Sequence, residues 1–210
     1  MIKKIIKLFI GFFLIALGVI LMRYASLGLN PWSTFHDGLS KVLNIKFGTA
    51  SQITGLIIIM ASLMLKIYPG IGTILNMFFC GFFINVIDTL NIVPMPSNIA
   101  SKILYLILGI WILSYGIYVY LSVGYGAGPR DGLMVGLIRL TGLKTSIIRT
   151  IIETSALLAG FLMGGTVGIG TVFSAFAIGH TIQYIFKINH FDPKSVNHLS
   201  LFDFFSVIFK

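Results

Sequence analysis

The chain has 210 residues, of which 57% are hydrophobic and only 10% charged, and its mean hydropathy is +0.98. A soluble domain has about a quarter of its residues charged, so this composition excludes a water-soluble globule and predicts an integral membrane protein in contact with a lipid bilayer. The net charge of +9 fits the basic residues that gather in cytoplasmic loops, and we expect no nucleic acid as a partner. The single Cys80 excludes an internal disulfide and a cysteine metal cluster.

In chain order, the first predicted element is a long apolar helix over 5–24, near the ~20 residues needed to cross a bilayer core. Its basic start also fits a secretory signal, but a counterpart at 102–123 argues that this segment is retained. A short helix follows, which "GLNPWSTFHDGL" opens, with Asn30 as a cap and Pro31 in the first turn. Two further long helices are predicted over 49–66 and 71–92.

The same order of elements then recurs. After the linker "NIVPMPSNIAS", a long helix is predicted over 103–123, followed by a short helix that "GAGPRDGLMVGL" opens. Long helices over 146–164 and 169–187 complete the set. The remaining polar tail ends in the amphipathic "LSLFDFFSVIFK", which we expect to lie along the membrane surface.

This recurrence is also visible residue by residue. When residues 4–87 are placed against 102–185 without gaps, 20 of 84 positions are identical, among them seven glycines and the pair Pro31/Pro129. The sequence therefore predicts a first transmembrane repeat at 4–87, a linker at 88–101, a second repeat at 102–185 and a cytoplasmic tail at 186–210.

The predicted fold class is an all-α polytopic membrane protein. It consists of two tandem homologous repeats, each with three long transmembrane helices and one short broken or re-entrant helix, or six long and two short helices in all. Both repeats contain a "GIGT" turn, whose glycines are Gly70 and Gly72 in one and Gly168 and Gly170 in the other. We interpret these glycines as structural turns that permit close packing; the alternative is that they line a substrate path.

Whether the repeats are parallel or inverted depends on whether the short helices cross the membrane. Basic residues recur in register in the two repeats at Lys4/Lys102, Lys41/Arg139 and Lys46/Lys144. A shared preference for the cytoplasm would keep such positions basic, which favours parallel repeats with eight crossing segments. In the inverted alternative the short helices dip into the membrane and return. Both arrangements place the two termini in the cytoplasm.

The short helices are the best candidates for a substrate or ion site. Their N-termini have unpaired N–H groups and a partial positive charge, and broken segments at matching places in two halves point to a transporter's binding site. The candidate residues in these segments are Trp32, Ser33, His36, Asp37, Arg130 and Asp131. Alternatively, Trp32 is an interfacial anchor and the pair Arg130–Asp131 a local cap.

Ionisable residues within the long helices are the second group of candidates, because charge at membrane depth is unfavourable. Glu153 replaces Gly55 of the first repeat, and Arg149 lies four residues before it on the same helix face. His180 replaces Phe82. The simpler interpretation is an internal ion pair and a locally hydrogen-bonded histidine; the alternative is a proton or cation site. We find no nucleophile–base pair, nucleotide-binding loop or metal-ligand spacing, so we predict no enzyme, no metal and no cofactor.

Several stretches resemble one bacterial family. They are "LGVILMRYASLGLNPWSTFHDGLS", "GTASQITGL" and "PGIGTILNMFFCGFFINVID" in the first half, and "GAGPRDGL" and "VGIGT" in the second. The sequence is similar here to the YitT/YczE-type (YczE/YyaS/YitT) integral membrane proteins. This resemblance implies a multi-pass protein of the bacterial cytoplasmic (inner) membrane. It implies no functional residues.

Together these observations predict a membrane transporter or permease-like protein for a small solute or organic ion, with its site between the repeats near the short helices. The alternative is a non-transporting accessory or sensor protein of a larger complex. A transporter should enclose a polar cavity that both short helices, Glu153 and His180 touch, whereas an accessory protein could be packed dry. The mass of 23.1 kDa is compatible with a homodimer.

Overall fold

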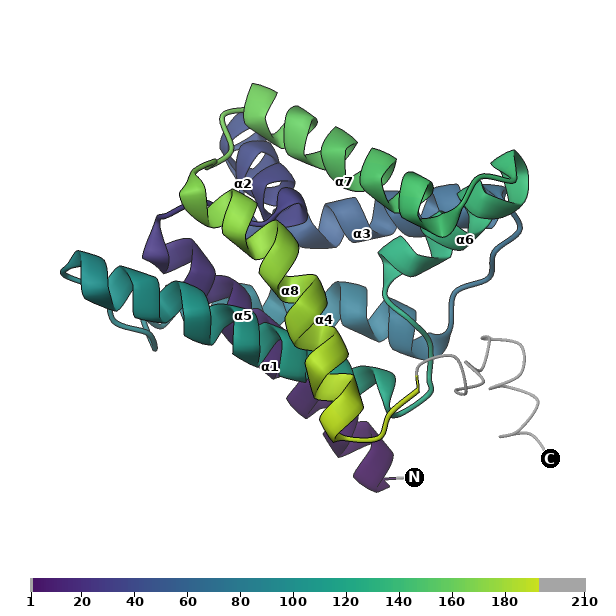
Figure 1. Ribbon diagram of the computed structural model, residues 1–210, viewed down its shortest axis with the longest axis horizontal. Coiled ribbons are helices and arrows are strands. Elements are labelled where there is room, and N and C mark those ends of the chain that lie inside the picture. The colour runs from purple at the N-terminus through teal and green to yellow at the C-terminus, as the bar shows by residue number, and fades with distance from the viewer. Residues whose placement is uncertain (1, 193–210) are drawn as a thin grey trace.

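The computed structural model describes residues 2–192, and the predicted amphipathic segment at the end of the chain lies outside them. All regular secondary structure in the described part is helical (Figure 1). The helices are α1 (Ile2–Ala25), α2 (Pro31–Leu43), α3 (Phe47–Met64), α4 (Ile71–Thr89), α5 (Ile99–Leu121), α6 (Pro129–Thr141), α7 (Thr145–Leu162) and α8 (Ile169–Ile188).

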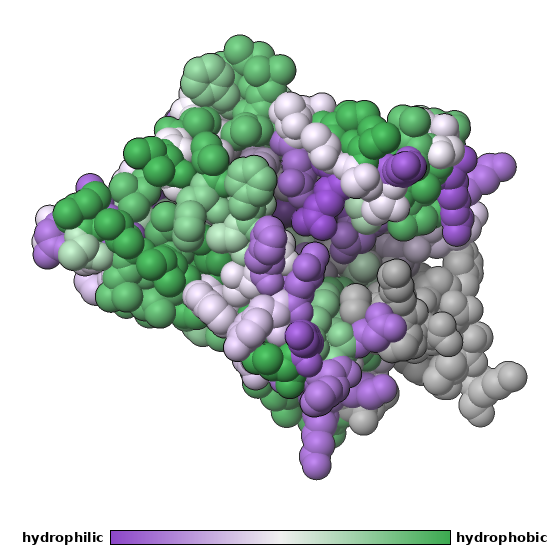
Figure 2. All heavy atoms as spheres, in the orientation of Figure 1, coloured by the Kyte–Doolittle hydropathy of each residue, from purple (hydrophilic) through white to green (hydrophobic). Residues whose placement is uncertain are grey.

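Six of these helices are long and apolar enough to cross a membrane: α1, α3, α4, α5, α7 and α8. The other two, α2 and α6, have 13 residues each, or about 20 Å at 1.5 Å per residue, which is less than the hydrocarbon core of a bilayer. Large apolar side chains such as Leu56, Met60 and Phe176 are exposed on the long helices. Hydrophobic atoms also cover the left-hand parts of α5 and α7 in Figure 2. The prediction of an all-helical membrane protein with several spans is therefore confirmed.

Local sequence explains where the two short helices begin and end. Asn30 accepts a hydrogen bond from the Ser33 backbone N–H (3.0 Å), and Pro31 occupies the first turn of α2. In α6 the cap is Gly128, whose N–H donates to the Asp131 carboxylate at 3.2 Å. Left-handed residues end both helices, at Asn44 (φ 51°) and at Gly142 (φ 69°).

The centre of the molecule is the pair α1 and α5, which lie side by side in Figure 1. Glycines let the two backbones approach closely, as small residues do in membrane helices. A Cβ added at Gly11 would contact Tyr120, and one added at Gly18 would contact Leu113. As residue numbers rise in α1 they fall in α5, so the two helices are antiparallel.

This antiparallel packing contradicts the arrangement that the basic residues favoured. If the repeats were parallel, α1 and α5 would cross the membrane in the same direction and Lys4 and Lys102 would share a side. Instead, Lys4 lies at the start of α1 and Lys102 at the start of the oppositely directed α5. The preference for parallel repeats with eight crossing segments does not fit this direction, since Lys4 and Lys102 lie at opposite ends of the bundle. The start of α1 and the end of α8 lie at the same end (Figure 1).

The two GIGT turns each bond to a glycine-containing loop of the other half. The Gly72 N–H donates to the Tyr125 carbonyl at 2.6 Å, and the Gly170 N–H donates to the Leu27 carbonyl at 2.7 Å. Each accepting residue precedes a glycine with positive φ, at Gly126 (126°) and Gly28 (113°). A side chain on Gly72 would collide with the Tyr125 carbonyl. These turns thus join the halves at opposite ends of the bundle.

The halves differ in how their last two helices pack. The N-terminal part of α3 lies directly against α4, where Asn85 accepts from the Gly48 N–H (2.9 Å) and donates to Thr49 (3.0 Å). By contrast, α7 and α8 hardly touch each other, and a Cβ at Gly179 of α8 would meet no atom within 4 Å. Hydrophilic atoms gather in the recess between α8 and the α6–α7 pair (Figure 2). We call the first half closed, because α3 packs against α4, and the second half open, because a recess separates α7 from α8.

Candidate functional site

A small internal cavity lies where the two short helices meet the first half of the bundle. Its volume is about 80 Å³, and α1, α2, α3, α4 and the N-terminus of α6 line it. We call it the central cavity. Its polar lining residues are Ser33, His36, Ser51, Thr54, Asn76 and Arg130. The apolar lining residues Ile15 and Cys80 are near the middle of α1 and α4, so the cavity lies at mid-height in the bundle.

The N-terminal ends of α2 and α6 come together at this cavity. The guanidinium carbon of Arg130 lies 4.8 Å from the centre of the Trp32 ring, which is a cation–π distance. Trp32 is only 9% exposed, and His36 packs beside it with 6.4 Å between ring centres. Arg130 retains exposed surface because it lines an opening rather than a packed core. Candidates from both halves thus share one site.

Several polar groups of the central cavity have no hydrogen-bond partner within residues 2–192. Ser33 is 4% exposed and His36 is 6% exposed. No described residue forms a hydrogen bond with the Ser33 hydroxyl, the His36 ring or the Arg130 guanidinium. The Asn76 amide and the Ser51 hydroxyl are likewise unpaired within the described chain. Because buried polar groups are nearly always hydrogen-bonded, this lining is arranged for water or for a ligand.

Asp37 and Asp131, the two acidic candidates of the short helices, have structural partners instead. One oxygen of Asp37 accepts from Lys41 Nζ (2.8 Å), from the Thr166 N–H (2.9 Å) and from the Thr166 hydroxyl (2.7 Å). These bonds fix α2 to the loop between α7 and α8. The Asp131 carboxylate accepts from the Gly128 N–H at the start of α6. Neither residue lines the central cavity.

Arg149 and Glu153 form an ion pair on α7, with 3.0 Å between Arg149 Nε and Glu153 Oε1. The exposed fractions of their side chains are 60% and 34%. The pair therefore lies on an accessible face of α7 and does not line the central cavity.

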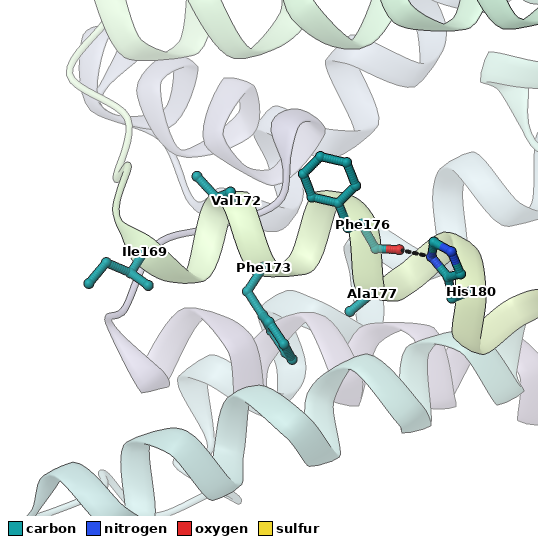
Figure 3. Close-up of a pocket in the computed structure, with 6 residues that line it drawn as sticks. All are labelled: Ile169, Val172, Phe173, Phe176, Ala177 and His180. Atoms are coloured by element: carbon teal, nitrogen blue, oxygen red, sulfur yellow. Dashed lines mark hydrogen bonds between the residues drawn. The ribbon is translucent and has the colours of Figure 1, made fainter.

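His180 is also separate from the central cavity. It is an exposed residue of α8 whose ring Nδ1 bonds to the Phe176 carbonyl at 2.8 Å, one turn earlier. It lines a shallow, mostly apolar hollow of about 420 Å³ along α8. Figure 3 shows Val172 and Phe176 pointing toward α7 and Phe173 pointing toward α5. The structure thus brings Trp32, Ser33, His36 and Arg130 together and leaves His180 and Glu153 outside.

Three polar lining residues were not among the sequence candidates: Ser51 and Thr54 on α3, and Asn76 on α4. Asn76 had a usable signal, because an amide inside an apolar helix is a candidate functional group in its own right. Ser51 and Thr54 are three residues apart and so share a helix face, but serine and threonine are common in membrane helices and bond to their own backbone. Thr54 does so with the Ala50 carbonyl at 2.8 Å.

Comparison with known proteins places this chain among bacterial membrane proteins. A family of unknown function, DUF6198, matches residues 2–187. An uncharacterized membrane protein of Bacillus subtilis, YczE, is 35% identical over 178 residues, which cover 84% of this chain and 82% of the relative. An uncharacterized protein of Haemophilus influenzae is 33% identical over 186 residues, which cover 89% and 84% of the two chains.

A more distant relative is the uncharacterized protein YyaS of Bacillus subtilis, which is 22% identical over 179 residues and covers 84% of this chain and 89% of its own. No solved structure matches the chain. The matches to YczE and YyaS confirm the resemblance to YczE-type membrane proteins, and they assign no activity.

Proposed function

The chain belongs to DUF6198, a family of unknown function. From its central cavity we propose that it is a membrane transporter or permease for a small solute or ion. The observation that carries this proposal is a set of unpaired polar groups at mid-height in a membrane bundle, where the two short helices meet. Ionisable and polar groups at that depth are unfavourable unless they serve a pathway or a site. Transporters commonly bind substrate at this level, against the N-termini of broken helices.

A duplicated, inverted architecture is the second part of the proposal. The helices α6, α7 and α8 each begin 98 residues after α2, α3 and α4, the same offset that aligns the two halves of the sequence. The antiparallel packing of α1 and α5 and the reciprocal bonds of the two GIGT turns support inversion. The short helices α2 and α6 then enter the membrane from opposite sides without crossing it.

The difference between the halves supports transport by alternating access. In inverted-repeat transporters the two halves exchange conformations around a fixed central site. Here α3 and α4 are packed together while α7 and α8 are apart. Closing α8 on α7 while α4 leaves α3 would move the opening from one end of the bundle to the other. The recess between α8 and the α6–α7 pair (Figure 2) is then an entrance.

The proposed orientation places the N-terminus and the end of α8 in the cytoplasm. The basic residues at that end of the bundle are Lys3, Lys4, Lys7, Lys66, Arg139, Lys144 and Lys187. The opposite end has Arg23, Lys41, Lys46 and Lys102. Two of those four are paired with carboxylates, Arg23 with Asp88 and Lys41 with Asp37. The excess of unpaired positive charge therefore marks the first end as cytoplasmic.

Flux into liposomes tests the proposal. Purified protein is reconstituted into liposomes, and the uptake of formate, nitrate, urea, glycerol and sodium is compared with uptake by empty liposomes. Liposomes with the variant R139Q, whose substitution is remote from the cavity, should take up solute as the parent does. Protein-dependent, saturable uptake of one of these classes is expected. Monodisperse, folded protein that moves none of them would favour the alternative, an accessory or sensor subunit of a membrane complex.

A further inference from the structure

The charge of the central cavity identifies what it can hold. Arg130 is the one formally charged residue among the described residues that line it, and no carboxylate lines it. Asp131 and Glu153 attract Arg130 electrostatically from outside the cavity. The neighbouring acids form hydrogen bonds with other groups: Asp37 bonds to Lys41 and Thr166, Glu153 to Arg149, and Asp131 to the Gly128 N–H. The lining therefore carries one positive charge that no acidic side chain inside the cavity balances.

The donors around Arg130 suit an anion. The Ser33 hydroxyl and the Asn76 amide both offer hydrogen-bond donors, and the neutral imidazole of His36 offers one N–H. Ser33 and His36 are more than nine-tenths buried, and no described residue forms a hydrogen bond with the Ser33 hydroxyl or the His36 ring. The N-terminal ends of α2 and α6, at Ser33 and Arg130, add the positive ends of two helix dipoles. A cation would meet repulsion from Arg130 and from the positive ends of the two helices.

The size and shape of the cavity narrow the class of anion. A volume of about 80 Å³ holds roughly two or three water molecules at ~30 Å³ each, which is far below the ~300 Å³ and more of pockets for drug-sized ligands. The guanidinium carbon of Arg130 lies over the Trp32 ring, and no described residue accepts a hydrogen bond from its N–H groups. Those groups match the two oxygens of a planar carboxylate or oxyanion.

We propose that the central cavity binds a small, planar, monovalent oxyanion of the formate or nitrate class, held by Arg130 together with Ser33, His36 and Asn76. This inference rests on the proposed transport function for its biological meaning, but binding itself can be measured without any flux. Arg130 is the residue that selects charge, and Trp32 holds its guanidinium in place.

The chain has two tryptophans, Trp32 and Trp111. The W111F variant therefore keeps a single indole, that of Trp32, which lies beside Arg130. Sodium formate and sodium nitrate are titrated into detergent-purified W111F protein at constant ionic strength, with tryptophan fluorescence and calorimetry as independent readouts. Urea, a neutral planar molecule of similar size, and gluconate, a large anion, are the matched controls. We expect saturable signals for formate and nitrate and none for urea or gluconate.

Variants at Arg130 distinguish loss of its charge from loss of the folded structure. R130Q should weaken formate binding at least about tenfold, since hydrogen bonds to charged groups are the strong ones. R130K keeps the charge and should favour chloride over formate, because a lysine lacks the planar fork. R139Q, at the far end of α6, should bind as the parent does. Folding of each variant is checked by size-exclusion chromatography and circular dichroism.

Equal binding of urea and formate, unchanged affinity in a folded R130Q protein, or no saturable binding by either readout would overturn the inference. Its failure is distinguishable from failure of the transport proposal. Arg130-dependent anion binding without flux would support the anion site and contradict the transport proposal. Flux of neutral solutes or cations without anion binding would do the reverse.

Discussion

Gly81 of α4 and Gly179 of α8 align when the two halves of the sequence are placed against each other. Their different surroundings make them a matched pair of test sites. A Cβ at Gly81 would lie against the carbonyl oxygen of Gly48 and the side chain of Gln52. A Cβ at Gly179 would meet no atom within 4 Å. We therefore predict that G81A destabilises the protein and that G179A does not.

The magnitudes follow from the two environments. To accommodate the methyl group that G81A adds, α3 and α4 must separate, and overpacking of this kind costs about 1–3 kcal/mol. Both substitutions gain up to about 1 kcal/mol of helix propensity, and at position 179 no clash opposes that gain. The propensity cancels in the comparison, so the variants should differ by about 1–3 kcal/mol, or roughly 2–12 °C in Tm for a chain of this length.

Thermal unfolding in detergent, followed by tryptophan fluorescence, measures this difference. A flux assay adds a second readout, because closing α8 on α7 would bring position 179 against α7 near Ser146, the counterpart of Gly48. The G179A variant should therefore keep the parental Tm and yet transport more slowly. Equal melting temperatures for G81A and G179A would refute the claim that one half is closed and the other open.

Two ion pairs give further predictions with opposite outcomes. D37N replaces a buried carboxylate that accepts three hydrogen bonds from Lys41 and Thr166; we expect a loss of about 3 kcal/mol, seen as a lower Tm in detergent, and an unchanged Tm would contradict the structural role given to Asp37. E153Q removes the ion pair with Arg149, whose side chain is 60% exposed, so unfolding should change by less than about 0.5 kcal/mol. A large drop in Tm for E153Q would show that this pair is buried.

The number and kind of helices could be predicted from the sequence because the signals are local. Apolar length predicts the six long helices, and Pro31 and Pro129 mark the starts of the two short ones. The predicted long helices agree with the observed bounds to within three residues at most ends, as in 5–24 against Ile2–Ala25.

The relative direction of the halves could not be predicted, because counting charges treats every basic residue as free. Lys41 matches Arg139 in the two repeats, but Lys41 is bonded to Asp37 and to the Gly164 carbonyl. Lys46 matches Lys144 but donates to Thr89 at 3.0 Å. Partners supplied by other helices neutralise or satisfy these cations, and only the folded chain shows them.

The candidate site could be predicted in part, because local sequence marks some of its residues but not those that tertiary packing brings in. The sequence marks the helix starts that carry Ser33, His36 and Arg130, which line the central cavity. Trp32, from the same segment as Ser33, packs against Arg130 and His36. The sequence indicated His180 and Glu153 because the two halves differ at these residues. Such a difference does not show where a side chain lies relative to the cavity. Asn76 joins the site from α4 by tertiary packing, which no local pattern specifies.

The most direct test of the account is whether closing α8 on α7 stops transport. Cysteines at Ser146 and Gly179, the counterparts of the packed Gly48 and Gly81, are introduced into a C80A background that lacks the native cysteine. Formate uptake into liposomes is then measured for S146C/G179C before oxidation, after oxidation and after reduction, beside C80A alone. The account predicts that a disulfide forms, that uptake falls on oxidation and that it recovers on reduction, with C80A unaffected. Uptake that persists in the cross-linked protein, or cysteines that never cross-link while uptake proceeds, would contradict it.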